Sequence, residues 1–220
     1  MPNESIWDEA LCRRYADSMR KLARYDHRGV ATRIARHLGG LRPRATVVEV
    51  ASGPGFLAIE LGRLLTEPTL VLVDSAKPML SIAEEEARRA GVPVRTIESS
   101  GDRIALPDAS ADVVLCKNLM NCIDASQRID VAREIARLLA PGGWAFVADF
   151  DVAGSRLAAT LIGLFTRFLV GAEFHRDFRA AFARRLDPGP LAAVLAEAGC
   201  STSIERSGPS FLLVARRAQA

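Results

Sequence analysis

Apolar positions recur along the chain with two different periods. In the first 40 residues they recur every three or four positions, as in Trp7, Leu11 and Tyr15, which predicts amphipathic helices. The same spacing returns from Val30 to Leu38, and the glycine pair at 39–40 ends it. Residues 1–40 are therefore expected to be helical.

Farther along, short runs rich in β-branched residues alternate with helical patterns. The helical patterns lie near residues 56–66, 77–90 and 126–139. Strands separated by helices are typical of βαβ units around a parallel sheet. We therefore predict an α/β fold with a Rossmann-like, doubly wound sheet. Its predicted strands are Thr46–Val50, Thr69–Asp74, Pro93–Glu98, Asp112–Lys117 and Trp144–Phe150.

The C-terminal third has a different pattern. A helix is predicted over 190–198, followed by two alternating runs, Ser201–Arg206 and Ser210–Arg216, with a turn between them. The last strand should then lie antiparallel in an otherwise parallel sheet. We predict one domain made of an N-terminal helical lid (1–40), a ligand-binding core (41–151), a helical cap inserted after the fifth strand (152–187) and a C-terminal helix and strand pair (188–220).

Composition narrows the class of protein. With 220 residues, 49% of them hydrophobic, the chain can bury one sizeable core. The net charge of +3 comes from basic residues scattered among acids, so no basic stripe indicates a nucleic-acid partner. The four cysteines form no C-x-x-C pair, and the charged N-terminus does not resemble a secretory signal. We expect reduced thiols and a cytoplasmic protein, with its oligomeric state left open.

One stretch, Leu157 to Ala172, is strongly apolar. It is shorter than the roughly 20 residues that span a membrane and is interrupted by Arg167, so a buried or cap helix is expected. Its large apolar residues recur at helical spacing. They would either form an apolar wall over a substrate or pack on the sheet in the ordinary way. These residues are Leu157, Leu161, Leu164, Phe165, Phe168 and Leu169.

The segment Val47 to Leu61 carries the main functional signal. It joins a buried strand to a glycine turn and then to a helix, so ligand groups can approach the backbone amides of the turn. Residues 53–58 also satisfy the dinucleotide pattern G-x-G-x-x-G/A, and Asp74 follows about 20 residues on, where an acid binds ribose hydroxyls. The turn alone therefore leaves the ligand class open.

Four motifs in order resemble those of the class I S-adenosylmethionine-dependent methyltransferases. The first is the acid and turn from Glu49 to Gly55, and the second is Asp74 followed by Met79 and Leu80. The third is Ser99-Ser-Gly-Asp102 with the Leu-Pro pair at 106–107, and the fourth is the Pro-Gly-Gly run at 141–143. The resemblance covers residues 46–150 and is closest to the small-molecule, quinone-biosynthesis-like type.

The resemblance implies S-adenosylmethionine as cofactor and S-adenosylhomocysteine as product. The turn amides would hold the cofactor carboxylate, Glu49 would act on its ammonium through water, and Asp74 would take the ribose diol. Met79 would lie against the adenine, while Asn118 and Asn121 would face the methionyl group or serve as helix-cap or turn residues. The implied cofactor-binding set is Glu49, Ala51, Ser52, Gly53, Gly55, Asp74, Ser75, Met79, Ser100, Gly101, Asp102, Asn118 and Asn121.

Two positions depart from the family pattern. Ala51 replaces the first glycine, which an alanine tolerates if the position keeps a negative φ. Ser100 stands where the family has an adenine-contacting acid, and Asp102 is the substitute if the register shifts. Both changes would weaken cofactor binding, which leaves a non-catalytic binding protein as one alternative.

Candidates for proton transfer are few, since the chain has three histidines. His27 and Tyr25 belong to a polar cluster in the N-terminal lid, and His175 ends the apolar cap segment as either a base or a solvated turn residue. His37 is expected at the surface. Asp149 and Asp151 have no third ligand in register, so no metal site is predicted.

The sequence therefore favours methyl transfer to a small, hydrophobic or aromatic metabolite by in-line displacement, mainly through alignment and exclusion of water. One alternative is a methyltransferase fold that uses S-adenosylmethionine, or an adduct derived from it, for intramolecular alkylation or cyclisation. A second is an NAD-dependent oxidoreductase that uses the glycines of the turn.

Overall fold

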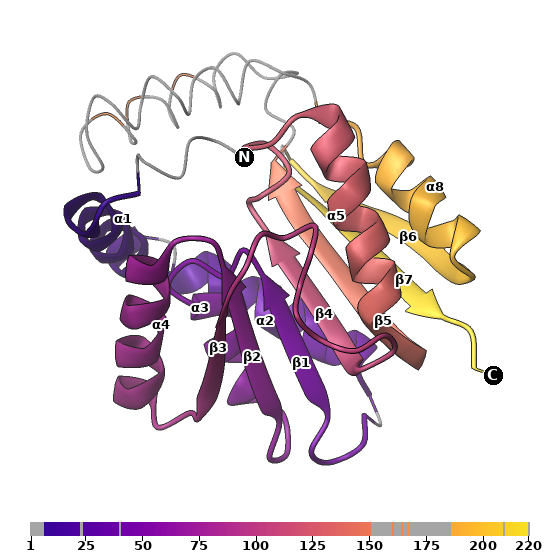
Figure 1. Ribbon diagram of the computed structural model, residues 1–220, viewed down its shortest axis with the longest axis horizontal. Coiled ribbons are helices and arrows are strands. Elements are labelled where there is room, and N and C mark those ends of the chain that lie inside the picture. The colour runs from indigo at the N-terminus through magenta and orange to yellow at the C-terminus, as the bar shows by residue number, and fades with distance from the viewer. Residues whose placement is uncertain are drawn as a thin grey trace.

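The computed structural model describes residues 7–22, 24–39, 41–150, 160, 164, 167, 186–208 and 210–219. Within these residues the chain forms a mixed sheet with helices on both faces (Figure 1). The helices are α1 (Glu9–Leu22), α2 (Arg24–His37), α3 (Phe56–Gly62), α4 (Lys77–Ala90), α5 (Ala125–Leu138) and α8 (Gly189–Glu197). The strands are β1 (Thr46–Val50), β2 (Thr69–Asp74), β3 (Val94–Glu98), β4 (Ala111–Lys117), β5 (Leu139–Phe150), β6 (Cys200–Ser207) and β7 (Ser210–Arg217).

The seven strands lie in the order β3-β2-β1-β4-β5-β7-β6. The first five are mutually parallel, and β7 runs antiparallel between β5 and β6. Strand order reverses between β1 and β4, and ligands of open α/β sheets bind outside the carboxyl ends of the strands at this reversal. The predicted fold class, including the antiparallel last strand, is confirmed.

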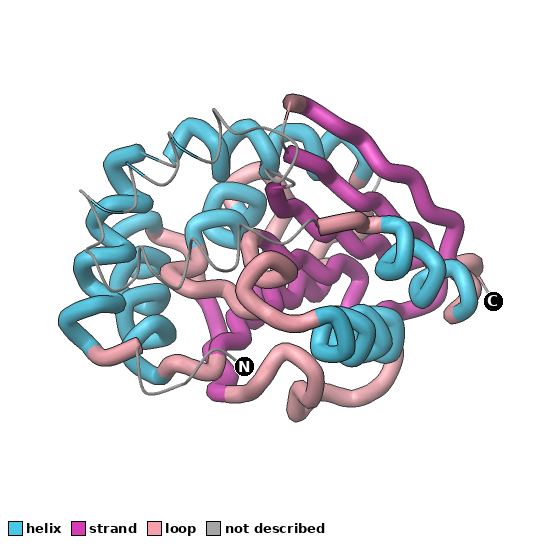
Figure 2. Tube along the Cα trace, turned by 90° about the horizontal axis from the view of Figure 1, so that it is seen from above, coloured by secondary structure: helices cyan, strands magenta, loops and turns pink. Residues whose placement is uncertain are grey.

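Two apolar layers sandwich the sheet. On one face, alternate residues such as Val48 and Val114 pack against α5 and α8. On the other face, Val47, Val113 and Leu115 pack against α2 and α3. Figure 2 shows the strands between these two groups of helices. Since side chains alternate along a strand, Glu49, Asp74 and Lys117 fall on the α2 and α3 face.

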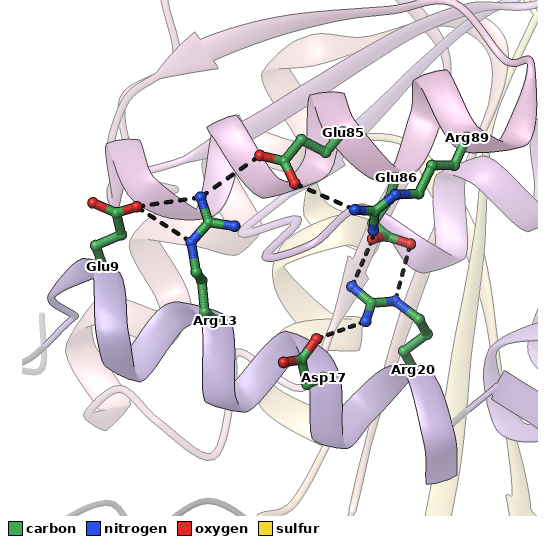
Figure 3. A network of polar contacts seen from close by, with 7 residues as sticks. All are labelled: Glu9, Arg13, Asp17, Arg20, Glu85, Glu86 and Arg89. Carbon is green, nitrogen blue, oxygen red and sulfur yellow. Dashed lines mark hydrogen bonds and ion pairs between the residues drawn. The ribbon is translucent and has the colours of Figure 1, made fainter.

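Helix α1 lies against α4, remote from the sheet. Its apolar side, including Cys12 and Ala16, packs on Met79 and Ile82. Beside this contact runs a chain of ion pairs shown in Figure 3. Arg20 donates two hydrogen bonds to Glu86, at 3.3 and 2.7 Å. The N-terminal helix is therefore attached to the sheet layer through α4.

Two element boundaries differ from the predictions by four residues or more. Helix α3 ends at Gly62, four residues early, and β5 begins at Leu139 rather than Trp144. Leu139 pairs with Ala111 ahead of an irregularity in the β4–β5 register, which extends the strand through the Pro-Gly-Gly run. His37, expected at the surface, is half-buried, and its Nε2 lies 2.9 Å from Glu205 Oε1.

The division into lid, core, cap and C-terminal pair stays a prediction, since most of residues 152–187 lie outside the described residues. Among the described helices, none has the length and apolar character needed to cross a bilayer.

Candidate functional site

The turn after β1 is built from left-handed backbone. Ala51, Gly53 and Gly55 have φ angles of 52°, 51° and 72°. A Cβ on Gly55 would lie 2.8 Å from Leu72 Cδ1, so only glycine fits there. The negative φ that would make an alanine tolerable at position 51 is absent, so Ala51 holds a left-handed backbone at a steric cost. The Ser52 amide, which donates to the Val73 carbonyl at 2.9 Å, ties the turn to β2.

Glu49 lies beneath this turn and is 3% exposed. Its Oε2 accepts a hydrogen bond from the Ala58 amide in the first turn of α3, at 3.0 Å. Burial raises the pKa of Glu49 to about 8, while the Ala58 hydrogen bond and the charge of Lys117 oppose that rise. Glu49 therefore serves as the N-terminal cap that Gly55 has no side chain to provide.

Asp74, at the end of β2, clamps the turn from the other side. Its Oδ2 accepts the Gly53 amide at 2.8 Å, and its Oδ1 accepts the Ala76 amide at 2.9 Å. Burial raises the pKa of Asp74, and these amides counteract the rise. Ser75 follows as a half-buried residue, whereas Met79 is 3% exposed and packs against α1.

The loop after β3 lies beside Asp74. The Ser99 amide donates to the Asp74 carbonyl at 3.0 Å, and Gly101 is buried where a Cβ would meet Val50 Cγ1 at 3.0 Å. Ser100 is half-buried, and Asp102 is exposed. Thus Gly101, more than either polar neighbour, is placed against the ends of the central strands.

Glu134 of α5 holds the next part of this loop. It accepts the Ile104 amide at 2.6 Å and pairs with Arg137, whose Nη2 lies 2.7 Å from Glu134 Oε1. Arg137 also donates to the carbonyl oxygens of Ile104 and Leu106. The helix before β5 therefore fixes the loop that approaches the strand ends.

Asn118 and Asn121 follow β4 and have different surroundings. Asn118 has a φ of 61°, and its Oδ1 is buried without a hydrogen-bond partner. The Asn121 side chain donates to Asp149 Oδ1 and to the Phe150 carbonyl, both at 2.6 Å. Asn118 thus offers an acceptor to a ligand, while Asn121 orders the end of β5.

A buried cation lies at the same edge. Lys117, the last residue of β4, is 6% exposed in its side chain, and its ammonium lies 2.7 Å from Asp26 Oδ2 on α2. His27, which follows Asp26 on α2, packs its ring on Phe56 with ring centroids 5.6 Å apart. Its Nδ1 atom is buried without a hydrogen-bond partner. Burial, then the charge of Lys117, lowers the pKa of His27 to about 3, so the imidazole is neutral.

Lys117 and Asp26 were not among the sequence candidates. The available signal was a charged residue directly after the apolar run of β4, at the edge where ligands bind in such folds. Its partner Asp26 is far away in sequence, so only the fold brings the two together.

The other catalytic candidates are placed less fully. Tyr25 lies in α2, but its side chain is outside the described residues, as is all of His175. Outside that candidate set, Tyr15 is half-buried on α1 and lies edge-on to Trp7, with ring centroids 5.5 Å apart. Burial is the main cause that raises the pKa of the Tyr15 hydroxyl, and the charge of Asp74 adds to the rise.

Two other chemistries find no support at this edge. Among the described residues, no group of three or more His, Cys, Asp or Glu side chains could hold a metal ion. Burial raises the pKa of the Cys116 thiol well above its ordinary value, which opposes formation of a nucleophilic thiolate.

A cavity of about 600 Å³ lies at the opposite, amino edge of the sheet. Trp144, Arg216 and His37 line it, and the Arg216 guanidinium stacks 4.9 Å from the Trp144 ring centroid. None of the glycine-turn residues lines this cavity. It is therefore separate from the site described above.

Residues 47–143 match the protein family described as "Methyltransferase domain". The chain is 32% identical over 120 residues to the demethylmenaquinone methyltransferase of Deinococcus radiodurans, a match that covers 54% of this chain and 48% of that protein. It is 28% identical over 129 residues to a ubiquinone/menaquinone biosynthesis C-methyltransferase of Azotobacter vinelandii, over 57% of this chain and 50% of that one. The matches thus span about half the length of these relatives.

Solved structures share the fold at low sequence identity. A SAM-dependent methyltransferase from Aquifex aeolicus superposes with a TM-score of 0.61 at 16% identity, over 84% of this chain and 88% of that one. An O-methyltransferase family protein from Burkholderia thailandensis gives a TM-score of 0.62 at 20% identity, over 91% of this chain and 60% of that one.

Proposed function

Because residues 47–143 form a class I S-adenosylmethionine-dependent methyltransferase domain, we propose that the chain transfers the methyl group of S-adenosylmethionine to a small, hydrophobic or aromatic metabolite. The family match and the fold indicate S-adenosylmethionine as the cofactor. The relatives named for quinone biosynthesis support an aromatic acceptor.

The residues at the carboxyl edge fit this cofactor. At Gly53 in the left-handed turn nothing lies within 4 Å of the Cβ position, so a carboxylate can approach the turn there, and Asp74 stands at the strand end where an acid meets a ribose diol. The unpaired Asn118 Oδ1 is a buried acceptor suited to an ammonium group. Three chemically different parts of the cofactor thus find suitable residues around one turn.

When bound, the cofactor supplies a methyl carbon already activated by the positive charge on sulfur. The chain's own residues then have two tasks, which are to align the acceptor and to exclude water. On α2, His27 carries a buried polar atom without a partner, and Phe56 packs against its ring as an apolar wall. No strong base is needed where the acceptor ionises easily.

The observation that carries the proposal is the hydrogen bond from the Gly53 amide to Asp74, at 2.8 Å. This hydrogen bond joins the glycine turn to the acid at the end of β2, the two motifs by which a methyltransferase domain binds its cofactor. It holds Asp74 beside the turn. The same contact would orient a ribose diol relative to the turn.

An NAD-dependent oxidoreductase is disfavoured by the contact of Glu49. In a dinucleotide-binding turn, the pyrophosphate lies at the helix N-terminus. Here the Glu49 side chain accepts a hydrogen bond from the Ala58 amide in the first turn of α3. An acid at this place competes with a diphosphate. No described contact favours cyclisation over methyl transfer.

The test is calorimetry with S-adenosylmethionine, S-adenosylhomocysteine and NAD, on wild type, Asp74→Ala and the exposed control Asp130→Ala. We expect both sulfur ligands to bind, with affinity reduced at least tenfold in Asp74→Ala only. Binding of NAD alone would overturn the assignment. Loss of the sulfonium ligand without any methylated product would favour the cyclisation alternative.

A further inference from the structure

The ion pair between Lys117 and Asp26 is buried on one side only. The Lys117 side chain is 6% exposed, whereas that of Asp26 is 46% exposed. A buried ammonium is costly unless paired, but its partner Asp26 reaches water, so Asp26 can turn away when another anion takes its place beside Lys117. The counter-ion of Lys117 is thus replaceable by another anion.

Acidic and aromatic side chains from other elements interact with Lys117. Besides Asp26 on α2, its charge acts on Glu49 of β1 and Asp149 of β5, since it opposes the rise in pKa of both carboxyl groups. Phe150 lies under the ammonium, with the ring centroid 5.9 Å from Nζ. One acid and one aromatic ring therefore lie against this cation, and two further acids on neighbouring strands interact with it electrostatically.

Beside the cation lies an unused hydrogen-bonding atom. His27 Nδ1 is buried without a partner, and leaving such an atom unpaired costs on the order of 1–3 kcal/mol. The neutral imidazole accepts or donates one hydrogen bond according to its tautomer. Phe56 and Phe150, both half-buried, add flat apolar surface next to His27 and Lys117.

We propose that Lys117 selects the methyl acceptor by binding the oxygen of a phenol or enol as its oxyanion, with His27 as the second contact and Asp26 as the resting counter-ion. This proposal rests on the proposed function for the methyl donor. A nearby cation favours the ionised form of a hydroxyl, and an aromatic ring attached to it fits against the two phenylalanines. A cationic donor at the same edge attracts the same anion.

The chemistry needs no further co-reactant. The hydroxyl proton leaves to water, and the Lys117 ammonium donates a hydrogen bond to the resulting oxyanion. The electron pair released on oxygen, directly or through the conjugated carbon, forms the bond to the methyl carbon. The carbon–sulfur electron pair stays on sulfur, and a carbon acceptor then loses its own proton to water.

The test uses 4-nitrophenol, whose anion absorbs at longer wavelength than the neutral phenol, titrated against pH with and without S-adenosylhomocysteine. We expect wild type to lower the pKa of the bound phenol by at least one unit, a tenfold preference for the anion. Lys117→Met should abolish that shift, Lys117→Arg should keep it, and the exposed control Lys77→Met should behave as wild type.

The Asp26→Asn variant distinguishes a Lys117 that binds the acceptor oxyanion from a Lys117 that only holds α2 in place through its ion pair with Asp26. Removal of the competing carboxylate should tighten binding of the phenolate and lower its pKa further, opposite in sign to Lys117→Met. If both variants weaken binding alike, or if wild type leaves 4-nitrophenol unbound or unshifted, the proposal is overturned. Wild type that shifts the phenol but does not bind S-adenosylhomocysteine would refute the proposed donor while retaining the role of Lys117.

Discussion

The carboxylate of Glu49 accepts the backbone amide of Ala58 at 3.0 Å, so an acid from β1 caps the helix on the far side of the glycine turn. Asp74 holds the same turn through Gly53. Two carboxylates thus shape the turn before any ligand arrives. One of them, Glu49, is 3% exposed, and its charged form is unfavourable there.

Glu49→Gln should flatten the dependence of stability on pH. Burial raises the pKa of Glu49 from 4.5 to about 8. The contribution of the Glu49 side chain to folding stability is therefore full below pH 4.5 and is lost as pH rises through about 8. Glutamine carries no charge and keeps an oxygen for the Ala58 amide. At pH 9 we expect the variant to be more stable than wild type by on the order of 2 kcal/mol.

Urea denaturation at pH 5 and pH 9 measures this difference. The control is Glu67→Gln, because the Glu67 side chain is 68% exposed. Equal pH slopes for wild type and Glu49→Gln would contradict the burial argument.

Ala51→Gly should not destabilise the protein, unlike most changes of alanine to glycine. With a φ of 52°, Ala51 carries a left-handed cost of roughly 1 kcal/mol that glycine avoids. The matched control is Ala87→Gly inside α4, where a loss of about 1 kcal/mol is expected. Thermal denaturation compares the two variants, and an equal loss in both would show that position 51 is not strained.

Asn118→Gly should separate cofactor binding from folding. Glycine keeps the φ of 61°, and the change removes a buried acceptor that has no partner. We expect stability to change by less than about 1 kcal/mol, whereas affinity for S-adenosylmethionine falls about tenfold. For Asn121→Ala we expect the opposite, a larger loss of stability than of affinity for S-adenosylmethionine, because the Asn121 side chain donates hydrogen bonds to Asp149 and to the Phe150 carbonyl. Calorimetry measures the affinity of both variants for S-adenosylmethionine, and denaturation measures their stability.

Arg20→Met should loosen α1 without unfolding the core. The Arg20 side chain is 40% exposed, so its pair with Glu86 adds about 1 kcal/mol or less, and salt screens it. Hydrogen exchange should accelerate in α1 relative to α2, and 0.5 M salt should reproduce part of that effect in wild type. Arg133→Met, which removes an exposed pair with Asp130, should leave α1 unchanged.

The strands were predictable wherever burial imposes a simple pattern. β1 and β2 have the predicted bounds because β-branched runs there end at a turn or a charged residue. The start of β5 was not predictable, since Leu139 to Gly143 shows no alternation and pairs through an irregular register. Pairing with a neighbouring strand, which sequence patterns do not show, decides such an end.

The site shows the same limit. Glu49, Gly53, Gly55 and Asp74 were named from their motifs, and the fold joins them through backbone amides. The sign of φ at Ala51 was not foreseen, because the turn's contacts with β2 impose it against the preference of alanine. The pair of Lys117 with Asp26 depends on how α2 crosses the strand ends, which no local pattern encodes.

The position of β7 between β5 and β6 bears on biosynthesis. Until residues 210–217 have left the ribosome, β5 keeps one unpaired edge and β6 has no neighbour within the sheet. The nascent chain can therefore assemble the parallel strands first but must wait for β7 to close that edge. During this interval an exposed strand edge is available to chaperones or to a second nascent chain.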